Sequence, residues 1–348
     1  MIMNKNAVLI LSDGSVFFGA GFGAIGFRTG ELVFNTSMQG YQEALTDPSY
    51  AGQILTLTYP LIGNYGLDIK NCESSKVWVS GFVVRELDFS SGLDKYLEDF
   101  GVGGIFGVDT REITKKIREF GVVSSCLAVY ENEKPDIEKI IKNLKFEYSL
   151  TDFVSKVGTS KVERFGSGNK KVVLIDLGVK MGIIRELNKR GIEVISVPYN
   201  FTSEEIRKFN PSGVVISNGP GDPALLKNVH KVIRELCDLP MFGICLGHQC
   251  IAHAFGGSTY KLKFGHRGSN HPVYDCFRKK VLITTQNHGF AVSKVPSCFE
   301  VTHYNLLDNS NEGMRHISKP IFSVQFHPES CPGPNDSREL FGEFIRGI

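Results

Sequence analysis

A cysteine stands between two glycines in the run Gly243-Ile-Cys245-Leu-Gly247, which links an apolar segment to a helix-like stretch. This is the nucleophile-elbow pattern, with cysteine in place of serine. The glycines permit a sharp strand-to-helix turn, which places the sulfur at the positive end of the helix and favours the thiolate. Cysteines are also often buried in ordinary turns. The flanking glycines favour the catalytic interpretation, and we predict that Cys245 is a nucleophile.

A nucleophilic cysteine needs a base, and the base needs an orienting group. The best candidate is His327, at the end of the apolar segment that begins at Ile321. Pro328 favours extended geometry at His327. Glu329 is near enough to fix the tautomer of the imidazole and to stabilise its cation. We therefore predict that His327 is the base and that Glu329 orients it.

The remaining histidines do not show the spacing of a helical metal site. His248 and His253 are five residues apart, as are His266 and His271, so neither pair has the i, i+4 spacing of ligands on one helix face. The chain also lacks an HExxH motif. We expect no metal site, and we assign His248 a structural role because it should point along the helix that follows Cys245.

Two further polar segments follow apolar strands. Ser217–Pro223 is a rigid loop whose N–H groups can face a substrate oxygen, although a plain turn is an equally good interpretation. It lacks the Lys and Ser/Thr of a phosphate loop. Thr285–Phe290 follows the strand predicted at Val281–Ile283, and taken alone it can be a network that stabilises a loop.

The 348 residues are enough for two domains. Residues 1–150 read as a β-rich α+β domain, in which Asp13-Gly14 is a hairpin signal. The predicted strands there are Ala7–Leu11, Val16–Phe18, Glu31–Phe34, Gln53–Thr58 and Val77–Val79, and the predicted helices are Thr110–Phe120 and Asp136–Leu144. Residues 151–171 are rich in Ser and Gly and have linker composition.

Residues 172–348 show alternating strands and helices, beginning with the continuous apolar strand Val172–Asp176. This order predicts an α/β domain with a parallel sheet and helices on both faces. Ligands in such sheets gather at the carboxyl ends of the strands. The predicted strands and helices of this part continue as Glu193–Pro198, Ser203–Phe209, Gly213–Ser217, Ala224–Leu236 and Pro240–Ile244.

The composition indicates a globular protein without a nucleic-acid surface. The net charge is +2, with 39 Lys+Arg against 37 Asp+Glu, and the cationic residues form no cluster. Neither a signal peptide nor a membrane-spanning segment is indicated, so we expect a cytoplasmic protein. The eight cysteines contain no CxxC pair and are expected to be reduced.

Taken together, the segments at Ser217–Pro223, Gly243–Gln249, Gln286–Phe290 and His327–Glu329 resemble the triad-type (class I) glutamine amidotransferase domain. Within that group, further stretches resemble the small subunit of the carbamoyl phosphate synthetase family. These stretches are Val33–Glu43, Leu45–Tyr50, Phe264–Val273 and Gln286–Val292. Two positions depart from the usual pattern: Ser269 replaces a glycine, and Ser330-Cys331 replaces small residues. Neither change removes a group that the chemistry requires.

The resemblance implies that Cys245 forms a γ-glutamyl thioester and releases ammonia, with His327 as base and Glu329 as its orienter. It implies that Gly219 and Leu246 supply oxyanion-hole N–H groups. The residues implied to bind glutamine are Ser49, Gly219, Gly221, Leu246, Gln249, Asn287, Gly289 and Phe290. Ser49 would reach the site from the other domain.

The resemblance also implies a large partner subunit that uses ATP, Mg²⁺ and bicarbonate to make carbamoyl phosphate for arginine and pyrimidine synthesis. No cofactor is expected in this chain. One alternative is the glutaminase of another amidotransferase, serving anthranilate or guanylate synthesis. The others are a stand-alone γ-glutamyl cysteine hydrolase and a regulatory subunit with an inactive site. The segments between Asn35 and Tyr50 argue against the first, and the intact Cys245, His327 and Glu329 argue against the last.

Overall fold

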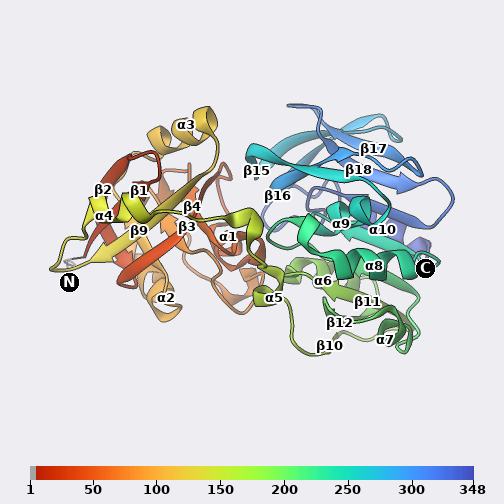
Figure 1. The fold of residues 1–348 in the computed structure, drawn as a ribbon. Helices are drawn as coiled ribbons and strands as arrows, with labels where there is room; N and C mark the ends of the chain where they lie inside the picture. Colours follow the sequence, from red (N-terminus) through yellow and green to blue (C-terminus); the bar gives the residue numbers. More distant parts are fainter. Residues whose placement is uncertain (1–4) are drawn as a thin grey trace. The chain divides into compact units, whose positions relative to one another are not determined.

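The computed structural model describes residues 5–348, and the chain folds into two compact units, Met1–Thr151 and Asp152–Ile348 (Figure 1). Each unit is described by itself. Among the described residues, no helix is both long and apolar enough to cross a membrane.

The N-terminal unit is built on a closed barrel in which β1 pairs with both β2 and β9. The strands in barrel order are β1 (Asn6–Leu11), β2 (Val16–Gly23), β8 (Gly103–Phe106), β6 (Gly81–Val83), β4 (Gln53–Leu57), β3 (Gly26–Asn35) and β9 (Val123–Tyr130). The hairpin turn predicted at Asp13-Gly14 is confirmed, because β1 and β2 are antiparallel and Gly14 has a φ of 87°. A separate pair of short strands is formed by β5 (Leu61–Ile62) and β7 (Glu86–Leu87).

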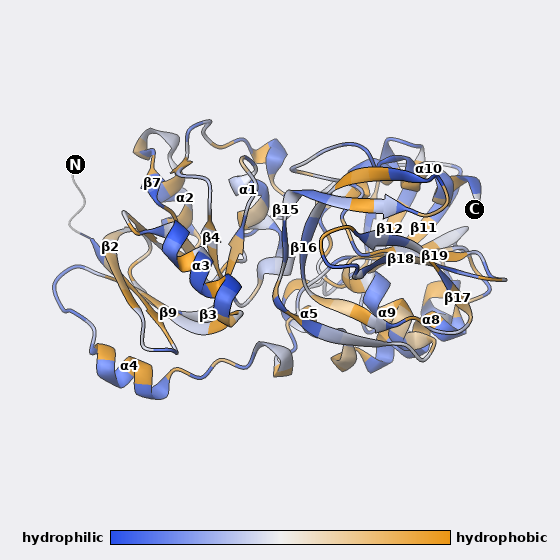
Figure 2. Cartoon of the chain, turned by 90° about the horizontal axis from the view of Figure 1, so that it is seen from above, coloured by the Kyte–Doolittle hydropathy of each residue, from blue (hydrophilic) through white to orange (hydrophobic). Residues whose placement is uncertain are grey.

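The helices of this unit are α1 (Tyr41–Thr46), α2 (Leu93–Asp99), α3 (Thr110–Phe120) and α4 (Ile137–Asn143). The prediction of α3 is confirmed: its N-cap Asp109 accepts a hydrogen bond from the N–H of Glu112, and Gly121 ends it. The helix α4 is amphipathic (Figure 2), and Ile137 and Ile140 pack against the barrel strand β1.

The strand predicted at Val77–Val79 is wrong. Val77 and Val79 are buried and Trp78 is partly buried, but the three residues lie outside the ladders, because the N–H of Trp78 donates to the carbonyl of Leu45 at 2.9 Å rather than to a strand. The neighbouring strand of the barrel, β6, begins at Gly81. A short apolar run predicts burial here without predicting pairing.

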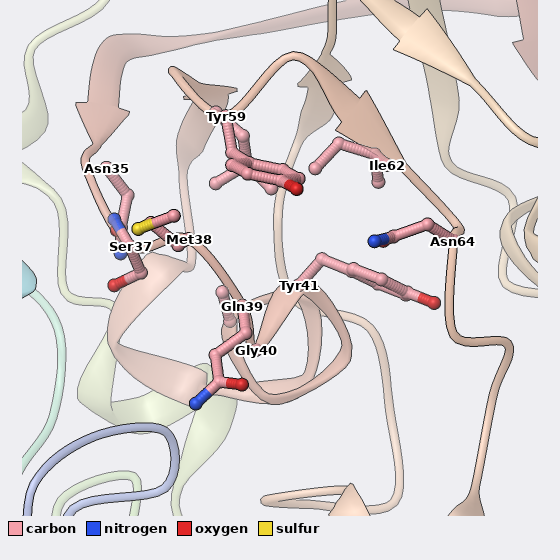
Figure 3. Close-up of a pocket in the computed structure, with 11 residues that line it drawn as sticks. Asn35, Ser37, Met38, Gln39, Gly40, Tyr41, Tyr59, Ile62 and Asn64 are labelled. Carbon is pink, nitrogen blue, oxygen red and sulfur yellow. The ribbon is translucent and has the colours of Figure 1, made fainter.

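A small hollow in this unit lies beside the start of α1 (Figure 3). Tyr41, Tyr59 and Ile62 are among the residues that line it. Only about 10 Å³ of it is open to the centre of a water molecule, which is room for about one water. The hollow is therefore too small to hold an amino acid.

The C-terminal unit contains one sheet whose central strands are parallel, as predicted. In sheet order the strands are β10 (Glu163–Phe165), β12 (Ile192–Pro198), β11 (Lys170–Asp176), β13 (Gly213–Ile216), β14 (Met241–Ile244), β19 (Ile321–Val324), β18 (Asn311–His316), β16 (Lys280–Lys294), β15 (Ser258–Asp275) and β17 (Phe299–Asn305). The last four strands in this order, β18, β16, β15 and β17, are antiparallel to their neighbours and extend the sheet on one side.

Helices cover both faces of this sheet, which confirms the predicted fold class. One apolar core contains residues of α7 (Ser203–Arg207), α8 (Lys227–Glu235) and α9 (Leu246–Ala254), and the other contains residues of α6 (Met181–Asn188) and α10 (Glu339–Arg346). Along β11, Val173 and Ile175 belong to the first core, whereas Val172 and Leu174 belong to the second. A strand that is buried on both faces therefore reads as continuously apolar.

Residues 151–171, which have linker composition, contain two regular elements before β11 begins at Lys170. They are α5 (Val154–Val157) and the edge strand β10, which pairs antiparallel with β12. The carboxylate of Asp176, at the end of β11, accepts a hydrogen bond from the N–H of Thr159 at 2.8 Å. Pairing with the rest of the unit thus orders a segment whose own composition favours neither helix nor strand.

Candidate active site

Cys245 occupies a sharp turn between β14 and α9. Its backbone has φ 55° and ψ −105°, a positive φ that is rare for a residue with a side chain. Its N–H donates to the carbonyl of Val324 in the neighbouring strand β19 at 2.9 Å. The cysteine is therefore held at the carboxyl end of a central strand and at the N-terminus of a helix, as the elbow motif predicts.

The two glycines that flank Cys245 are needed for steric reasons. A Cβ atom on Gly243 would lie 2.9 Å from the carbonyl carbon of Gly247. A Cβ atom on Gly247 would lie 2.2 Å from the carbonyl oxygen of Ile216. Neither position can hold a side chain unless the backbone moves, so the glycines allow α9 to start close against β13 and β14.

His327 and Glu329 form a buried hydrogen-bonded pair just beyond β19. The Nδ1 atom of His327 lies 2.6 Å from Oε1 of Glu329, and the side chains are 1% and 0% exposed. The backbone N–H of His327 donates to the carbonyl of Thr285 at 2.9 Å. Within residues 5–348, Nε2 of His327 has no hydrogen-bond partner. The free Nε2 is the ring atom that can exchange a proton with a reacting group.

Lys180, which the sequence analysis missed, contacts the same carboxylate. Its Nζ atom donates to Oε1 of Glu329 at 3.0 Å and to the carbonyl of Ser330 at 2.9 Å, and the side chain is 3% exposed. Lys180 follows the carboxyl end of β11 and precedes α6. Ligands bind at the carboxyl ends of the strands in a parallel sheet, so the position of Lys180 directly after a predicted strand is the signal that could have identified it from the sequence.

The charges in this cluster shift the pKa values of both His327 and Glu329. Burial would lower the pKa of His327, but the negative charges of Glu329 and Cys245 outweigh it and raise the pKa to about 10. Burial would raise the pKa of Glu329, but Lys180 and His327 outweigh it and lower the pKa to about 2. The geometry thus favours an imidazolium at His327 beside an ionised Glu329.

Three of the residues implied to bind glutamine are linked to α9. When Cys245 is protonated, its Sγ atom donates to the carbonyl of Asn287 at 3.6 Å. The side-chain amide of Gln249 donates to the carbonyl of Phe290 at 2.7 Å and to Oε1 of Gln325 at 2.9 Å. The β16 segment that contains Asn287, Gly289 and Phe290 is therefore fixed against the helix that begins after Cys245.

Gly219 and Leu246, the implied oxyanion-hole donors, are also neighbours. A Cβ atom on Gly219 would lie 2.1 Å from the carbonyl oxygen of Leu177 and 3.0 Å from Cδ2 of Leu246. Gly221, two residues further on, has a φ of 95°. The loop after β13 thus lies so close to the backbone carbonyl of Leu177, which follows β11, that only glycine fits at position 219, and it also contacts the side chain of Leu246 at the start of α9.

Ser49 lies in the N-terminal unit, in the short helix Pro48–Tyr50. It is buried, and its N–H donates to the carboxylate of Asp47 at 2.9 Å. Its role in binding glutamine stays a prediction.

Two other residues near the candidate triad, His248 and Cys331, make hydrogen bonds outside it or to its backbone. His248 is fully buried, and its Nδ1 atom lies 2.8 Å from the hydroxyl of Ser323, which agrees with a structural role. The Sγ atom of Cys331 donates to the carbonyl of Glu329 at 3.6 Å. A second thiol therefore lies close to the candidate triad, and labelling must be mapped to individual cysteines.

The raised pKa of His327 predicts how the reactivity of Cys245 depends on pH. Because the folded-state pKa is above 6.5, the imidazolium persists as the pH rises past 6.5 and is lost only near pH 10. The rate at which iodoacetamide alkylates Cys245, mapped by mass spectrometry, should therefore show no step near pH 6.5. A clear step there would contradict the ion-pair interpretation.

Comparisons with known proteins match both parts of the chain to protein families. Residues 173–346 match the family described as glutamine amidotransferase class-I, and residues 9–127 match the carbamoyl-phosphate synthase small chain, CPSase domain.

Three relatives cover nearly the whole chain. The carbamoyl phosphate synthase small chain of Methanocaldococcus jannaschii is 51% identical, over 98% of this chain and 98% of its own length. The small chain of Fusobacterium nucleatum subsp. nucleatum is 48% identical, over 99% of this chain and 98% of its own length. The pyrimidine-specific small chain of Bacillus subtilis is 46% identical, over 98% of this chain and 95% of its own length. The chain therefore belongs to the carbamoyl phosphate synthase small chain family.

Proposed function

We propose that this chain is the glutamine-hydrolysing subunit of a carbamoyl phosphate synthase. The observation that carries the proposal is the buried row of Lys180, Glu329 and His327 beside the elbow cysteine, Cys245. A thiolate and an imidazolium form together without a change in net charge, and the carboxylate of Glu329 against the ring offsets part of the cost of burying the imidazolium. A strained elbow and a glycine-bounded loop complete a site for acyl transfer.

In the first half of the reaction, the thiolate Sγ of Cys245 attacks the side-chain carbonyl carbon of glutamine. The backbone N–H groups of Leu246 and Gly219 stabilise the oxyanion. His327 Nε2 donates its proton to the amide nitrogen, the C–N bond breaks, and ammonia leaves. The product that remains is a γ-glutamyl thioester on Cys245.

In the second half, His327 Nε2 removes a proton from water as the water oxygen attacks the thioester carbonyl. The C–S bond breaks, glutamate leaves, and the thiolate and imidazolium are restored. Glu329 remains ionised throughout, which its low pKa favours. Glu329 and Lys180 act as positioning residues. Glu329 holds the ring of His327 and raises its pKa, and Lys180 holds the carboxylate of Glu329, so neither touches the reacting atoms.

We further propose that the ammonia passes to a large partner subunit that binds ATP and Mg²⁺, in a cytoplasmic heterodimer. The product, carbamoyl phosphate, would serve arginine as well as pyrimidine synthesis. The near full-length similarity to small chains supports a separate large chain, and the name of the B. subtilis relative refers to pyrimidines.

The test is to measure glutamate release from glutamine by the purified chain, alone and with the large subunit from the same organism. We expect slow hydrolysis alone and a strong increase with the partner, because an amidotransferase must avoid wasting ammonia. Full hydrolysis without the partner would instead indicate a stand-alone γ-glutamyl hydrolase. Production of carbamoyl phosphate from glutamine by the mixture tests the transfer step separately.

A further inference from the structure

A second cluster of chemically active side chains lies on three neighbouring strands of the C-terminal sheet. His266 on β15 is the cross-strand partner of His288 on β16, and Glu312 lies on β18, which neighbours β16. One potential ligand atom from each of these three residues lies within 4.8 Å of the others. The residues are only 6%, 5% and 0% exposed. None of the steps proposed for glutamine hydrolysis uses them.

The hydrogen bonds of His266 direct one lone pair into this cluster. Its Nε2 atom lies 2.9 Å from Oδ2 of Asp308, so the carboxylate fixes the tautomer with the proton on Nε2. The other nitrogen, Nδ1, lies 3.6 Å from Oε1 of Glu312 and accepts a long hydrogen bond of 3.4 Å from Nδ2 of Asn305, which a metal ion would replace. Two ligands about 2.0–2.1 Å from a tetrahedral Zn²⁺ lie roughly 3.4 Å from each other. Nδ1 and Oε1 are therefore spaced almost as two ligands of one ion would be.

His288 has more acceptors around it than one neutral ring can satisfy. Its Nδ1 atom lies 2.7 Å from the carbonyl oxygen of Phe290, and its Nε2 atom lies 2.9 Å from Oε1 of Gln286. A neutral imidazole ring has a single N–H. One ring nitrogen must then present its lone pair to an oxygen lone pair.

Rotating the amide of Gln286 does not remove this conflict. Its nitrogen already donates to Oε2 of Glu312 at 2.9 Å and to the hydroxyl of Thr284 at 3.1 Å. A rotated amide would turn its oxygen towards the carboxylate of Glu312. Because the shorter contact of His288 is to Phe290, the proton belongs on Nδ1, and Nε2 is the lone pair beside Gln286.

The charges of the cluster also favour a cation. Glu312 is fully buried, and its carboxylate is held by neutral side-chain amides from Gln286 and from Asn305, the latter at 3.0 Å. With Asp308, two carboxylates lie against two imidazole rings. A buried charge is costly unless it is paired. One divalent ion would balance both carboxylates.

We propose that His266 Nδ1, His288 Nε2 and Glu312 bind one Zn²⁺ ion, with Oε1 of Gln286 as the fourth ligand. Two imidazoles and a carboxylate form a ligand set that Zn²⁺ accepts, and a closed four-ligand site is a structural one. Asp308 and the Phe290 carbonyl would be the outer partners that orient the two rings. The ion would fix β15, β16 and β18 to one another beside the segment that contains Asn287 and Phe290.

A proton is the competing cation. The carboxylates of Asp308 and Glu312 lie 2.9 Å and 3.6 Å from the two ring nitrogens of His266, so a proton on each nitrogen would also face a carboxylate. An imidazolium at His266 would satisfy Glu312 but would leave the two acceptors around His288 unresolved. A measurement of metal binding therefore distinguishes a Zn²⁺ site from a protonated cluster.

The test uses the whole purified chain, stripped of metal with a chelator and desalted. After Zn²⁺ is added back and the excess is removed, we expect one Zn²⁺ per chain by elemental mass spectrometry, and after Co²⁺ is added instead we expect visible absorption bands of a four-coordinate site that Zn²⁺ abolishes. Glu312→Gln, which keeps the side-chain shape, should remove the Co²⁺ bands. Asp308→Asn should weaken Zn²⁺ binding about 10–100-fold, the typical effect of losing an outer-shell partner.

The matched control is His303→Asn. His303 is also buried and also faces a carboxylate, with Nε2 3.6 Å from Oδ2 of Asp275, but it lies outside the cluster. This variant should keep the full Co²⁺ spectrum. The proposal is overturned if the wild type binds no stoichiometric metal, or if Glu312→Gln binds as the wild type does. Thiolate-to-cobalt charge transfer without the bands that depend on Glu312 would assign the metal to cysteines and also overturn it.

Two features keep this test clear. Circular dichroism of the stripped variants separates loss of a ligand from loss of the fold, and Asp308→Asn changes a partly exposed side chain if Glu312→Gln proves unstable. Metal content and Co²⁺ spectra are measured without glutamine, so the result does not depend on the proposed glutaminase activity.

Discussion

Replacing Cys245 with serine is expected to lower the rate of glutamine hydrolysis by roughly 10⁶-fold, the size of effect seen when a triad nucleophile is removed. A serine hydroxyl is a far weaker acid than a thiol and would not form an ion pair with His327. The negative charge that Cys245 contributes to the raised pKa of His327 would also be lost. The measurement is glutamate release with saturating glutamine, in the presence of the large subunit.

The matched control for this prediction is Cys331→Ser. Cys331 lies two residues after Glu329 and is partly buried, so it is the thiol that a mapping error would most easily confuse with the nucleophile. We expect this variant to keep near wild-type activity. An acid quench with radiolabelled glutamine should trap a γ-glutamyl adduct in both wild type and Cys331→Ser, and none in Cys245→Ser. An active Cys245→Ser variant would show that the nucleophile is elsewhere.

Local signals account for the parts of the structure that could be predicted from the sequence. The bounds of α3 follow from a capping aspartate and a terminal glycine, and the parallel sheet follows from apolar strands that alternate with helices. The barrel of the N-terminal unit could not be predicted in this way. Its closure depends on the pairing of β1 with β9, two strands that are far apart in the sequence, and no local pattern specifies that register.

The same distinction applies to the candidate sites. Cys245 and the pair of His327 and Glu329 lie in short motifs, and the structure places the two members of the pair in contact. Lys180 reaches Glu329 across a sequence separation of 149 residues, which no spacing argument detects. The i, i+4 spacing rule detects metal ligands only when they lie on one face of a helix. The cluster of His266, His288 and Glu312 instead draws one residue from each of three strands, and only the sheet brings them together.

Glu329→Gln is expected to lower kcat by about 10⁴-fold while changing KM for glutamine much less, since the carboxylate does not touch the substrate. The amide keeps the shape of the side chain, but it removes the charge that raises the pKa of His327. The imidazolium would then form less readily, and the amide nitrogen could hold the ring in the wrong tautomer. The pH profile of Cys245 alkylation should accordingly move towards the ordinary pKa of histidine.

The same substitution should also destabilise the fold, and a second change can separate the two effects. Glu329→Gln leaves the ammonium of Lys180, which is 3% exposed, without its carboxylate, and breaking a buried pair in this way costs about 3–5 kcal/mol. Adding Lys180→Met removes the unpaired charge, so the free energy of unfolding measured in urea should recover towards wild type. Glutamine hydrolysis should not recover, because His327 still lacks its charged partner. Recovery of both would mean that Glu329 matters only for stability, whereas recovery of neither would mean that the cost of Glu329→Gln does not arise from the unpaired Lys180.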